Sequence, residues 1–278
     1  MKRIGPPRGI VLALGALLSL LLFGLQPARA ASLQDIFSRH DAASRQRVDH
    51  SAWDQLLAKY VVAGKDGLNR VDYKRFKREG AETLKRYLAE LQKVDPARLA
   101  KPEQLAFWVN LYNALTVDVV LKHYPVKSIR DIRLSSFLVP GPWDAKLVSV
   151  KGVQLSLNDI EHEILRPVWR DPRVHYAVNC ASVGCPNLQP AAFTGERVEA
   201  MLEKGARDYV NSPRGAQVIG VSLVASKIYS WFAADFGGTL EALLSHLRRY
   251  AGPELAAALA RVTRVARYEY DWSLNDLR

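Results

Sequence analysis

One short stretch of the chain, residues 173–188, contains both cysteines together with a histidine and an asparagine. A free thiol, with a pKa of about 8.5, is only slightly ionised at neutral pH, so a nucleophilic cysteine needs a base nearby. His175, five residues before Cys180, is a candidate base. The stretch therefore predicts thiol-dependent hydrolysis or acyl transfer at an amide, such as a peptide, isopeptide or γ-glutamyl bond, with Cys180 as the nucleophile.

Residues that precede this stretch, together with Asn179 within it, complete the predicted site. His162 is a second candidate base, and Glu161 beside it can hold an imidazole in one tautomer and orientation. The side-chain amide of Asn179 or Asn110 can donate a hydrogen bond to an oxyanion, and Asn113 lies one helical turn beyond Asn110. The predicted catalytic residues are Cys180, His175, His162 and Glu161, and the predicted oxyanion-binding or orienting residues are Asn179, Asn110 and Asn113.

Residues 174–179 alternate in a way that is typical of a strand, because β-branched and aromatic side chains take every second position. A turn rich in glycine and proline follows and carries the thiols. In an ideal strand His175 and Cys180 point to opposite faces and lie more than about 10 Å apart. His175 can therefore serve Cys180 only if the chain folds back, whereas His162, on a helix predicted over 157–165, escapes this constraint.

The strongest predicted element is a helix over 101–123, opened by Pro102 and closed before Pro125. Its apolar residues cover more than one face, which indicates a central and nearly fully buried helix. Asn110 and Asn113 lie inside this apolar girdle, and buried amides must find hydrogen-bond partners. Two interpretations stay open: the amides brace neighbouring backbone, or one of them orients a catalytic group.

The other periodic segments complete a mixed fold. They predict a helix over 195–211, two short strands within 146–155 and a closing strand over 265–274. No repeat, low-complexity tract or long linker divides the chain. We predict one α+β domain over 31–278, with the central buried helix packed on a small, mostly antiparallel sheet and helices at the periphery.

Residues 1–30 have the pattern of a cleaved secretory signal. Basic residues open the segment, an apolar run over 10–25 follows, and Ala28-Arg29-Ala30 forms a small-x-small cleavage site before Ala31. The apolar run is short for a membrane span, so we expect export to the periplasm or medium and no stable membrane span after cleavage. Loss of the leader lowers the formal net charge from +11 to +7.

The charge pattern narrows the possible partners. Lysines and arginines are dispersed, with no basic block interleaved with aromatic residues, which argues against nucleic-acid binding. Contact with anionic envelope surfaces remains compatible with the basic mature chain. We expect no cofactor and no metal, because a set of His162, His175, Cys180 and Cys185 does not have a standard zinc spacing.

Two alternatives to a single catalytic thiol stay open. Cys180 and Cys185 are close enough in sequence to form a disulfide across a tight turn, which an oxidising compartment would favour. The chain can also be a non-catalytic binding module of the cell envelope, holding an acidic or peptide ligand in a groove near the same stretch.

Five separated blocks, in the same order, resemble the domain-of-unknown-function 547 family over roughly residues 45–275. They are FWVNLYNALTVDVVLKHYP (107–125), LNDIEHEILRP (157–167), DPRVHYAVNCASVGCPNL (171–188), SKIYSWFAADF (226–236) and YDWSLN (270–275). The resemblance implies an α+β domain distantly similar to papain-like and transglutaminase-like cysteine enzymes. It also implies a Glu-His-Cys triad, proposed for some members, while other members look non-catalytic.

The resemblance assigns the same residues by motif. Cys180 falls on the family's asparagine-cysteine position, and Cys185 falls where some relatives have a serine. His175 matches the histidine of its block, and Glu161 and His162 match the acidic and histidine positions of the IEH block.

The leader generates the first testable prediction. We expect chain recovered from the periplasm or medium of an expressing bacterium to begin at Ala31, as measured by N-terminal sequencing and intact mass. Ala30→Phe replaces the small residue at the cleavage site and should leave the leader attached. Exported wild-type chain that still begins at Met1 would contradict the assignment.

Overall fold

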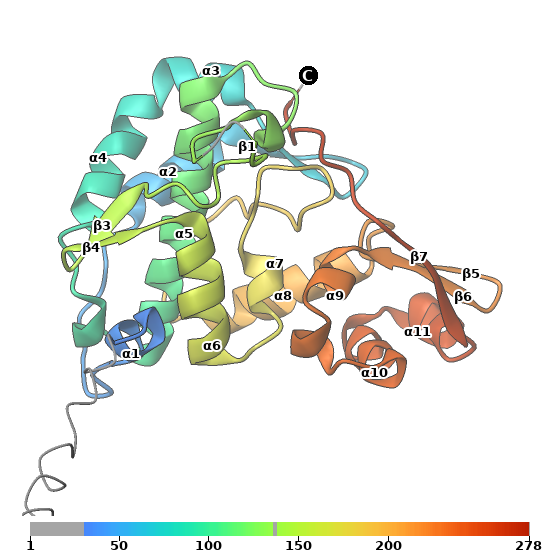
Figure 1. The fold of residues 1–278 in the computed structure, drawn as a ribbon. Helices are drawn as coiled ribbons and strands as arrows, with labels where there is room; N and C mark the ends of the chain where they lie inside the picture. Colours follow the sequence, from blue (N-terminus) through green and yellow to red (C-terminus); the bar gives the residue numbers. More distant parts are fainter. Residues whose placement is uncertain (1–30, 136–137, 278) are drawn as a thin grey trace, which may run out of the picture. The chain divides into compact units, whose positions relative to one another are not determined.

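The computed structural model describes residues 31–135 and 138–277. Ser32–Arg278 form one compact unit that mixes helices with small sheets (Figure 1). The predicted α+β class is therefore confirmed. The leader predicted for residues 1–30 lies outside the described residues.

A long central helix, α5 (Lys101–His123), has the bounds that the sequence predicts. Between Glu103 and Leu121 every residue except Asp118 is buried. A helix enclosed in this way must be apolar on all faces, which is the pattern that its sequence shows. The segments that pack around it are α3 (Tyr73–Glu79), α4 (Ala81–Leu91), α8 (Val198–Val210) and the π-helical segment η3 (Asp159–Leu165).

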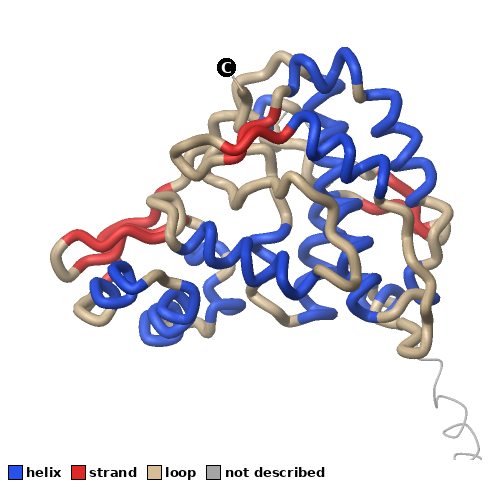
Figure 2. Tube along the Cα trace, turned by 180° about the vertical axis from the view of Figure 1, so that it is seen from behind, coloured by secondary structure: helices blue, strands red, loops and turns tan. Residues whose placement is uncertain are grey.

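Shorter helices surround this centre, and they account for most of the regular structure seen from behind in Figure 2. In the first half of the chain they are α1 (Leu33–Phe37), α2 (Ser51–Tyr60), η1 (Pro96–Arg98) and η2 (Ile129–Asp131). In the second half they are α6 (Arg166–Trp169), α7 (Val174–Ala177), α9 (Ile228–Trp231), η4 (Ala233–Phe236), α10 (Leu240–Tyr250) and α11 (Pro253–Leu259).

Among the residues that the structure describes, the strands form three small sheets. The antiparallel pairs are β1 (Val61–Ala63) with β2 (Asn69–Val71), β3 (Val148–Val150) with β4 (Val153–Leu155), and β5 (Ala216–Ile219) with β6 (Ser222–Ser226). β7 (Arg264–Glu269) adds to β6 in parallel. The sheet content is therefore mostly antiparallel, as predicted, but divided among three sheets. Lys151 and Gly152 both have positive φ angles, which closes the β3–β4 turn where the sequence places it.

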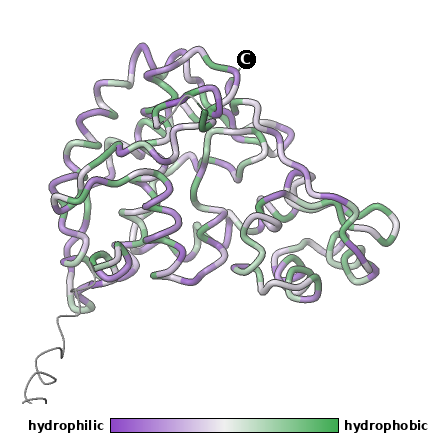
Figure 3. The backbone as a smooth tube through the Cα atoms, viewed as in Figure 1, coloured by the Kyte–Doolittle hydropathy of each residue, from purple (hydrophilic) through white to green (hydrophobic). Residues whose placement is uncertain are grey.

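Two clusters of buried side chains form the core. The larger is built around α5, and the smaller joins α8 to β5, β6, α10 and α11. Hydrophilic and hydrophobic residues alternate along the outer helices, as they do in amphipathic helices with one apolar face (Figure 3). Helix α7 belongs to both clusters, because Val174 and Ala177 pack in the larger one and Tyr176 in the smaller. The segment with the candidate residues is thus held between the clusters.

The strand predicted over 174–179 is wrong, because the structure has one helical turn there, α7. Asp171 starts the turn: its carboxylate accepts from the backbone N–H of Arg173, and Pro172 has the backbone angle of a first helical residue. Every residue from 174 to 179 is buried. The alternation therefore does not separate a core face from a solvent face, and the local Asp-Pro signal decides the conformation.

The closing strand predicted over 265–274 is regular only as far as Glu269, where β7 ends. The next residues run along the cysteine loop: Val183 N–H donates to Ser273 O at 2.8 Å and Gly184 N–H to Asp271 O at 2.8 Å. A Cβ on Gly184 would come within 2.7 Å of the Asp271 nitrogen, so only glycine fits here. This pairing brings the end of the chain to the thiols.

Two buried amides of α5 hold the chain that surrounds the candidate site. The Asn113 side chain donates to Ala177 O (2.9 Å) and accepts from Asn179 N–H (2.8 Å). Asn110 makes the same pair of bonds with the backbone of Phe193, at 2.8 and 3.0 Å. Both amides therefore brace backbone, the first of the two interpretations that the sequence left open.

No helix among residues 31–135 and 138–277 combines the length and the apolar character that a membrane crossing requires.

The brace at Asn113 leads to a stability prediction. Asn113→Ala leaves the Ala177 carbonyl and the Asn179 N–H buried without partners, so we expect a loss of about 2–4 kcal/mol in the free energy of unfolding. Urea unfolding followed by circular dichroism measures it. Lys85→Ala on α4, where the side chain is 76% exposed, is the control and should change the free energy by less than about 0.5 kcal/mol. Equal stability of the two variants would contradict the brace.

Candidate active site

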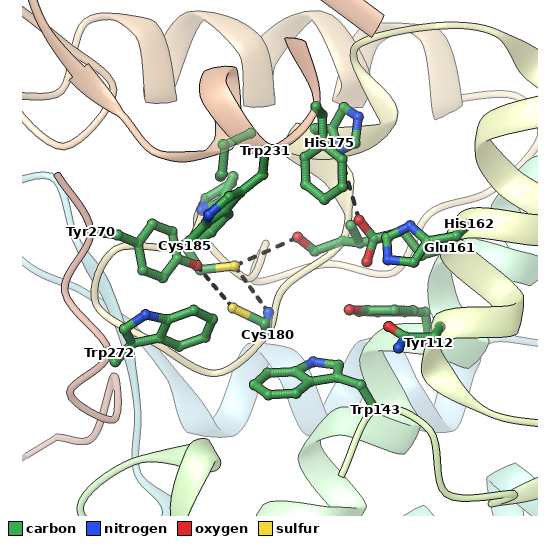
Figure 4. A pocket seen from close by; sticks show the side chains of 15 residues that line it. Tyr112, Trp143, Glu161, His162, His175, Cys180, Cys185, Trp231, Tyr270 and Trp272 are labelled. Carbon is green, nitrogen blue, oxygen red and sulfur yellow. Dashed lines mark hydrogen bonds and ion pairs between the residues drawn. The ribbon is translucent and has the colours of Figure 1, made fainter. Parts of the chain in front are cut away.

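A cavity of about 190 Å³ lies where α5, η3, α7, α9, the loop after α7 and the segment after β7 meet (Figure 4). All four residues predicted as catalytic line it, although they come from three separate segments. The side chains in its wall that can act as acids, bases or nucleophiles are Glu161, His162, His175, Cys180, Cys185 and Tyr270.

The Cys180 thiol is only half-buried and makes hydrogen bonds to hydroxyl groups. Its Sγ lies 3.0 Å from Tyr270 Oη and 3.2 Å from Ser182 Oγ. Ser182 donates to Tyr270 Oη at 3.0 Å, which leaves the tyrosine hydroxyl free to donate to the sulfur. Cys180 is thus placed at the cavity wall with the Tyr270 hydroxyl directed at it, rather than sealed in apolar packing.

A strained residue follows the nucleophile candidate. Ala181 has φ +61°, a left-handed conformation that a residue with a Cβ adopts rarely. It is fully buried and held from both sides: its N–H donates to Asn179 Oδ1 at 2.9 Å and its carbonyl accepts from Asn275 N–H at 3.1 Å. Strain of this kind persists only where surrounding contacts fix it, and it collects at functional sites.

Cys185 lies beside Cys180 but is buried. Its Sγ accepts from the backbone N–H of Cys180 at 3.0 Å, and both cysteines are free thiols. The hydrogen bond from Cys185, with those from Ser182 and Tyr270, lowers the pKa of Cys180 against the opposing effect of burial. Burial, together with the neighbouring Cys180, raises the pKa of Cys185 well above its usual value.

His175 is held by a carboxylate that is in turn held by an arginine. Its Nε2–H donates to Asp235 Oδ2 at 2.7 Å, and Arg166 binds both oxygens of Asp235, at 2.6 and 3.0 Å. The ring stacks on Phe232 with the centroids 4.2 Å apart. Since Nε2 is engaged, Nδ1 is the nitrogen that remains for proton transfer.

Glu161 faces the other nitrogen of the same imidazole. Its Oε1 lies 3.7 Å from His175 Nδ1, an ion-pair distance and too long for a good hydrogen bond. The sequence assigned Glu161 to hold the imidazole, but the shorter bond of His175 goes to Asp235. Glu161 is therefore a buried carboxylate beside the imidazole in the cavity wall.

Burial and charge act against each other in this network. Burial alone would lower the pKa of His175, but the carboxylates of Asp235 and Glu161 raise it above its usual value. The hydrogen bond from His175, and then Arg166, hold the pKa of Asp235 well below its usual range. Burial opposes ionisation of Glu161, yet His175 and His162 lower its pKa. The network therefore favours an imidazolium between two carboxylates.

His162 presents a different nitrogen to the cavity. Its Nδ1 lies 3.4 Å from Arg166 Nη1, and a guanidinium only donates hydrogen bonds. The neutral ring is therefore assigned with its proton on Nε2. Since no described residue accepts from that nitrogen, His162 is available as a hydrogen-bond donor to a ligand in the cavity.

The three asparagines predicted to bind an oxyanion do not line the cavity. Besides the braces made by Asn110 and Asn113, Asn179 donates to Pro186 O at 2.6 Å and accepts from Ala181 N–H. The contacts of Asn113 and Asn179 fit an orienting role, because they fix the backbone on both sides of Cys180, whereas Asn110 fixes the backbone at Phe193.

One side of the cavity is aromatic. Tyr270 lies 4.7 Å from Trp272 and 4.9 Å from Trp231 between ring centroids, and Trp143 lies 5.6 Å from Trp272. Figure 4 shows these rings around the two sulfurs, with Glu161, His162 and His175 on the other side. The cavity thus has an apolar wall made of aromatic rings and, on the other side, a wall of ionisable side chains.

The predicted set of site residues omits Tyr270, Asp235 and Arg166. Tyr270 and Asp235 both fall in blocks that carry the family resemblance, 270–275 and 226–236, so a signal for them was present. Arg166 is four residues after His162, at the start of α6, which directly follows η3. What the sequence lacks is any indication that these distant blocks meet at one cavity.

Within residues 31–135 and 138–277, no group of three or more histidine, cysteine or acidic side chains is arranged to hold a metal ion.

A family model described as "Protein of unknown function, DUF547" matches residues 96–210. The matched segment contains α5 and the four residues predicted as catalytic, but not Asp235 or Tyr270. Neither the curated proteins nor the solved structures gave a match. The resemblance to this family is therefore confirmed over 96–210, whereas the papain-like and transglutaminase-like character of the fold stays a prediction.

The contacts of Asp235 lead to a prediction about pH. Asp235→Asn removes the main partner that raises the pKa of His175, so that pKa should fall towards or below about 6.5, as measured by NMR titration of the ring. Stability that comes from a raised histidine pKa is present below about pH 6.5 and is lost as the pH rises through the folded-state pKa. Wild type should therefore lose stability over that range, and the variant should not.

Asp208→Asn is the matched control, because Asp208 makes a surface ion pair with Lys204 on α8. It should leave the titration of His175 unchanged. A His175 pKa that is the same in wild type and Asp235→Asn would refute the assigned network.

Proposed function

We propose that this chain, whose residues 96–210 match the DUF547 family model, is a thiol-dependent hydrolase or acyltransferase that acts on peptide, isopeptide or γ-glutamyl amide bonds. One observation carries the proposal: a half-exposed thiol with hydroxyl donors lines the same cavity as an imidazole held between two carboxylates. A lowered thiol pKa and a raised imidazole pKa together favour a thiolate–imidazolium pair at neutral pH.

In the proposed reaction the Cys180 thiolate attacks the amide carbonyl, and the carbonyl oxygen becomes an oxyanion. Tyr270 Oη, 3.0 Å from the sulfur, and the Nε2–H of His162 are the donors that the cavity offers to this oxygen. Collapse of the tetrahedral intermediate breaks the C–N bond and leaves an acyl-thioester on Cys180. Water then completes hydrolysis, or an amine completes acyl transfer.

The proton of the thiol goes to Nδ1 of His175, with Glu161 beside that nitrogen as a relay. Asp235, neutralised in part by Arg166, keeps the ring in one orientation through Nε2. His175 later returns the proton to the departing amine. The base is therefore His175, and the orienting acid is Asp235 rather than Glu161.

A second candidate function has its own support. The aromatic wall formed by Trp143, Trp231, Tyr270 and Trp272 is suited to hold a ligand without chemistry, which favours a binding module for a peptide or acidic ligand. The reactivity of Cys180 separates the two functions, since binding alone needs no ionised thiol. Export is part of either proposal and rests on the leader predicted for residues 1–30.

Alkylation by iodoacetamide at about pH 6, read by intact mass, tests the proposal. We expect wild type to gain one label rapidly, and Cys185→Ala to gain one label more slowly because it lacks the contact that lowers the pKa of Cys180. Cys180→Ala should gain none at that pH. Labelling that survives in Cys180→Ala but is lost in Cys185→Ala would identify the other sulfur. A rate that rises only near the ordinary thiol pKa of about 8.5 would favour the binding module.

Histidine variants test the assigned base. His175→Gln should lower the alkylation rate at about pH 6 by roughly tenfold or more, because it removes the imidazolium that the proposal pairs with the thiolate. His40→Gln, at an exposed position, is the control and should leave the rate unchanged. Hydrolysis of γ-glutamyl and α-peptidyl p-nitroanilides by wild type, and its loss in Cys180→Ala, then assigns the bond that is cleaved.

A further inference from the structure

Cys185 is a second thiol in the cavity wall that the proposed reaction does not use. It is buried, and its sulfur lies 3.0 Å from the backbone nitrogen of Cys180. Figure 4 shows the two sulfurs next to each other, beside Tyr270. A nucleophilic thiol with a second thiol beside it is the arrangement in which a sulfenic acid is converted to a disulfide.

We propose that Cys180 and Cys185 form a hydroperoxide-sensitive thiol pair, in which Cys180 is oxidised and Cys185 resolves the product to an intramolecular disulfide. The inference rests on the proposed function, because it uses the same reactive Cys180. It adds a reversible modification site whose oxidant is a small hydroperoxide.

The loop geometry suits the bridge. The chain turns sharply at left-handed Ala181, and Cys185 N–H donates to Ser182 O at 3.1 Å, so the segment between the thiols is a closed turn. Gly184 packs directly against the backbone of Asp271, which holds the far side of the turn. Because the Cys185 sulfur lies 3.0 Å from the Cys180 backbone nitrogen, the two side chains are already neighbours in the reduced state, and the bridge would close within this turn.

The chemistry balances in two steps. The Cys180 thiolate attacks one oxygen of the hydroperoxide; an S–O bond forms, the O–O bond breaks, and the alkoxide or hydroxide leaves and takes a proton from solvent. The sulfur of Cys185 then attacks the sulfenic sulfur; the S–S bond forms, the S–O bond breaks, and the departing hydroxide takes the Cys185 proton to leave as water. Two thiols lose two electrons, and the hydroperoxide gains them.

The difference in burial explains why Cys180 is oxidised first and Cys185 reacts second. Cys180 is half-exposed at a cavity that admits a molecule the size of hydrogen peroxide, whereas Cys185 is 5% exposed. Cys185 is also kept protonated by burial and by the charge of its neighbour, and that charge disappears when Cys180 becomes a neutral sulfenic acid. Cys185 therefore becomes a better nucleophile only after Cys180 has reacted.

The test uses the full chain, reduced, desalted and treated with one to several equivalents of hydrogen peroxide. Wild type should lose about 2 Da in intact mass, with a Cys180–Cys185 linkage in the non-reduced digest, and dithiothreitol should reverse the loss. Cys185→Ser should instead gain about 16 Da at Cys180, trapped by dimedone. In Cys180→Ser, oxidation of Cys185 should be at least tenfold slower than disulfide formation in wild type.

The outcomes that overturn the inference are distinct from those that overturn the proposed function. If Cys180 of wild type proceeds to sulfinic acid or links only between chains, the thiol pair is wrong even though rapid alkylation at about pH 6 still supports the enzyme. If both sulfurs alkylate as ordinary thiols and the disulfide nevertheless forms, the enzyme proposal fails and the pair stands. The wild-type measurements need no variant to fold.

Discussion

The buried amide of Asn113 sets the geometry on which the candidate site depends. It bonds the carbonyl of Ala177 and the N–H of Asn179, and so fixes the short segment that joins His175 to Cys180. Because α5 is enclosed on nearly all sides, this amide cannot move without disturbing the core. The backbone around the thiol is therefore anchored to the most rigid element of the fold, which is how a reactive group can be placed precisely while lying in a loop.

The cavity places two kinds of environment against each other. On one side the imidazole of His175 lies between the carboxylates of Asp235 and Glu161, and Arg166 forms an ion pair with Asp235. On the other side hydroxyl groups and tryptophan rings surround the sulfurs. Desolvation would push every ionisable group there towards its neutral form, and the fixed partners reverse that tendency for His175, Asp235 and Glu161. Perturbed groups that face one cavity are the pattern expected of a reactive site.

The two cysteines differ in exposure although Cys185 Sγ lies 3.0 Å from the Cys180 backbone nitrogen. The Cys180 sulfur contacts the hydroxyl groups of Ser182 and Tyr270, while Cys185 is enclosed and contacts the Val178 carbonyl at 3.8 Å. A contact of this kind serves two purposes at once: the Cys185 thiol stabilises the thiolate of Cys180, and it is the nearest nucleophile when that thiolate is oxidised. The same hydrogen bond therefore links the proposed catalysis to the proposed modification.

The sequence by itself determined the α+β class, the bounds of α5 and the β3–β4 turn, because local periodicity and capping express these features. It also selected Cys180, His175, His162 and Glu161, and the structure has these four residues in the wall of one cavity. It failed at α7, where alternation in a fully buried segment imitates a strand. Only the tertiary structure decided that one helical turn carries His175 to the same cavity as Cys180, that Asp235 rather than Glu161 holds the imidazole most closely, and that Tyr270 reaches the thiol. These contacts join residues 60 to 90 positions apart, and no local pattern encodes which distant segments pack together.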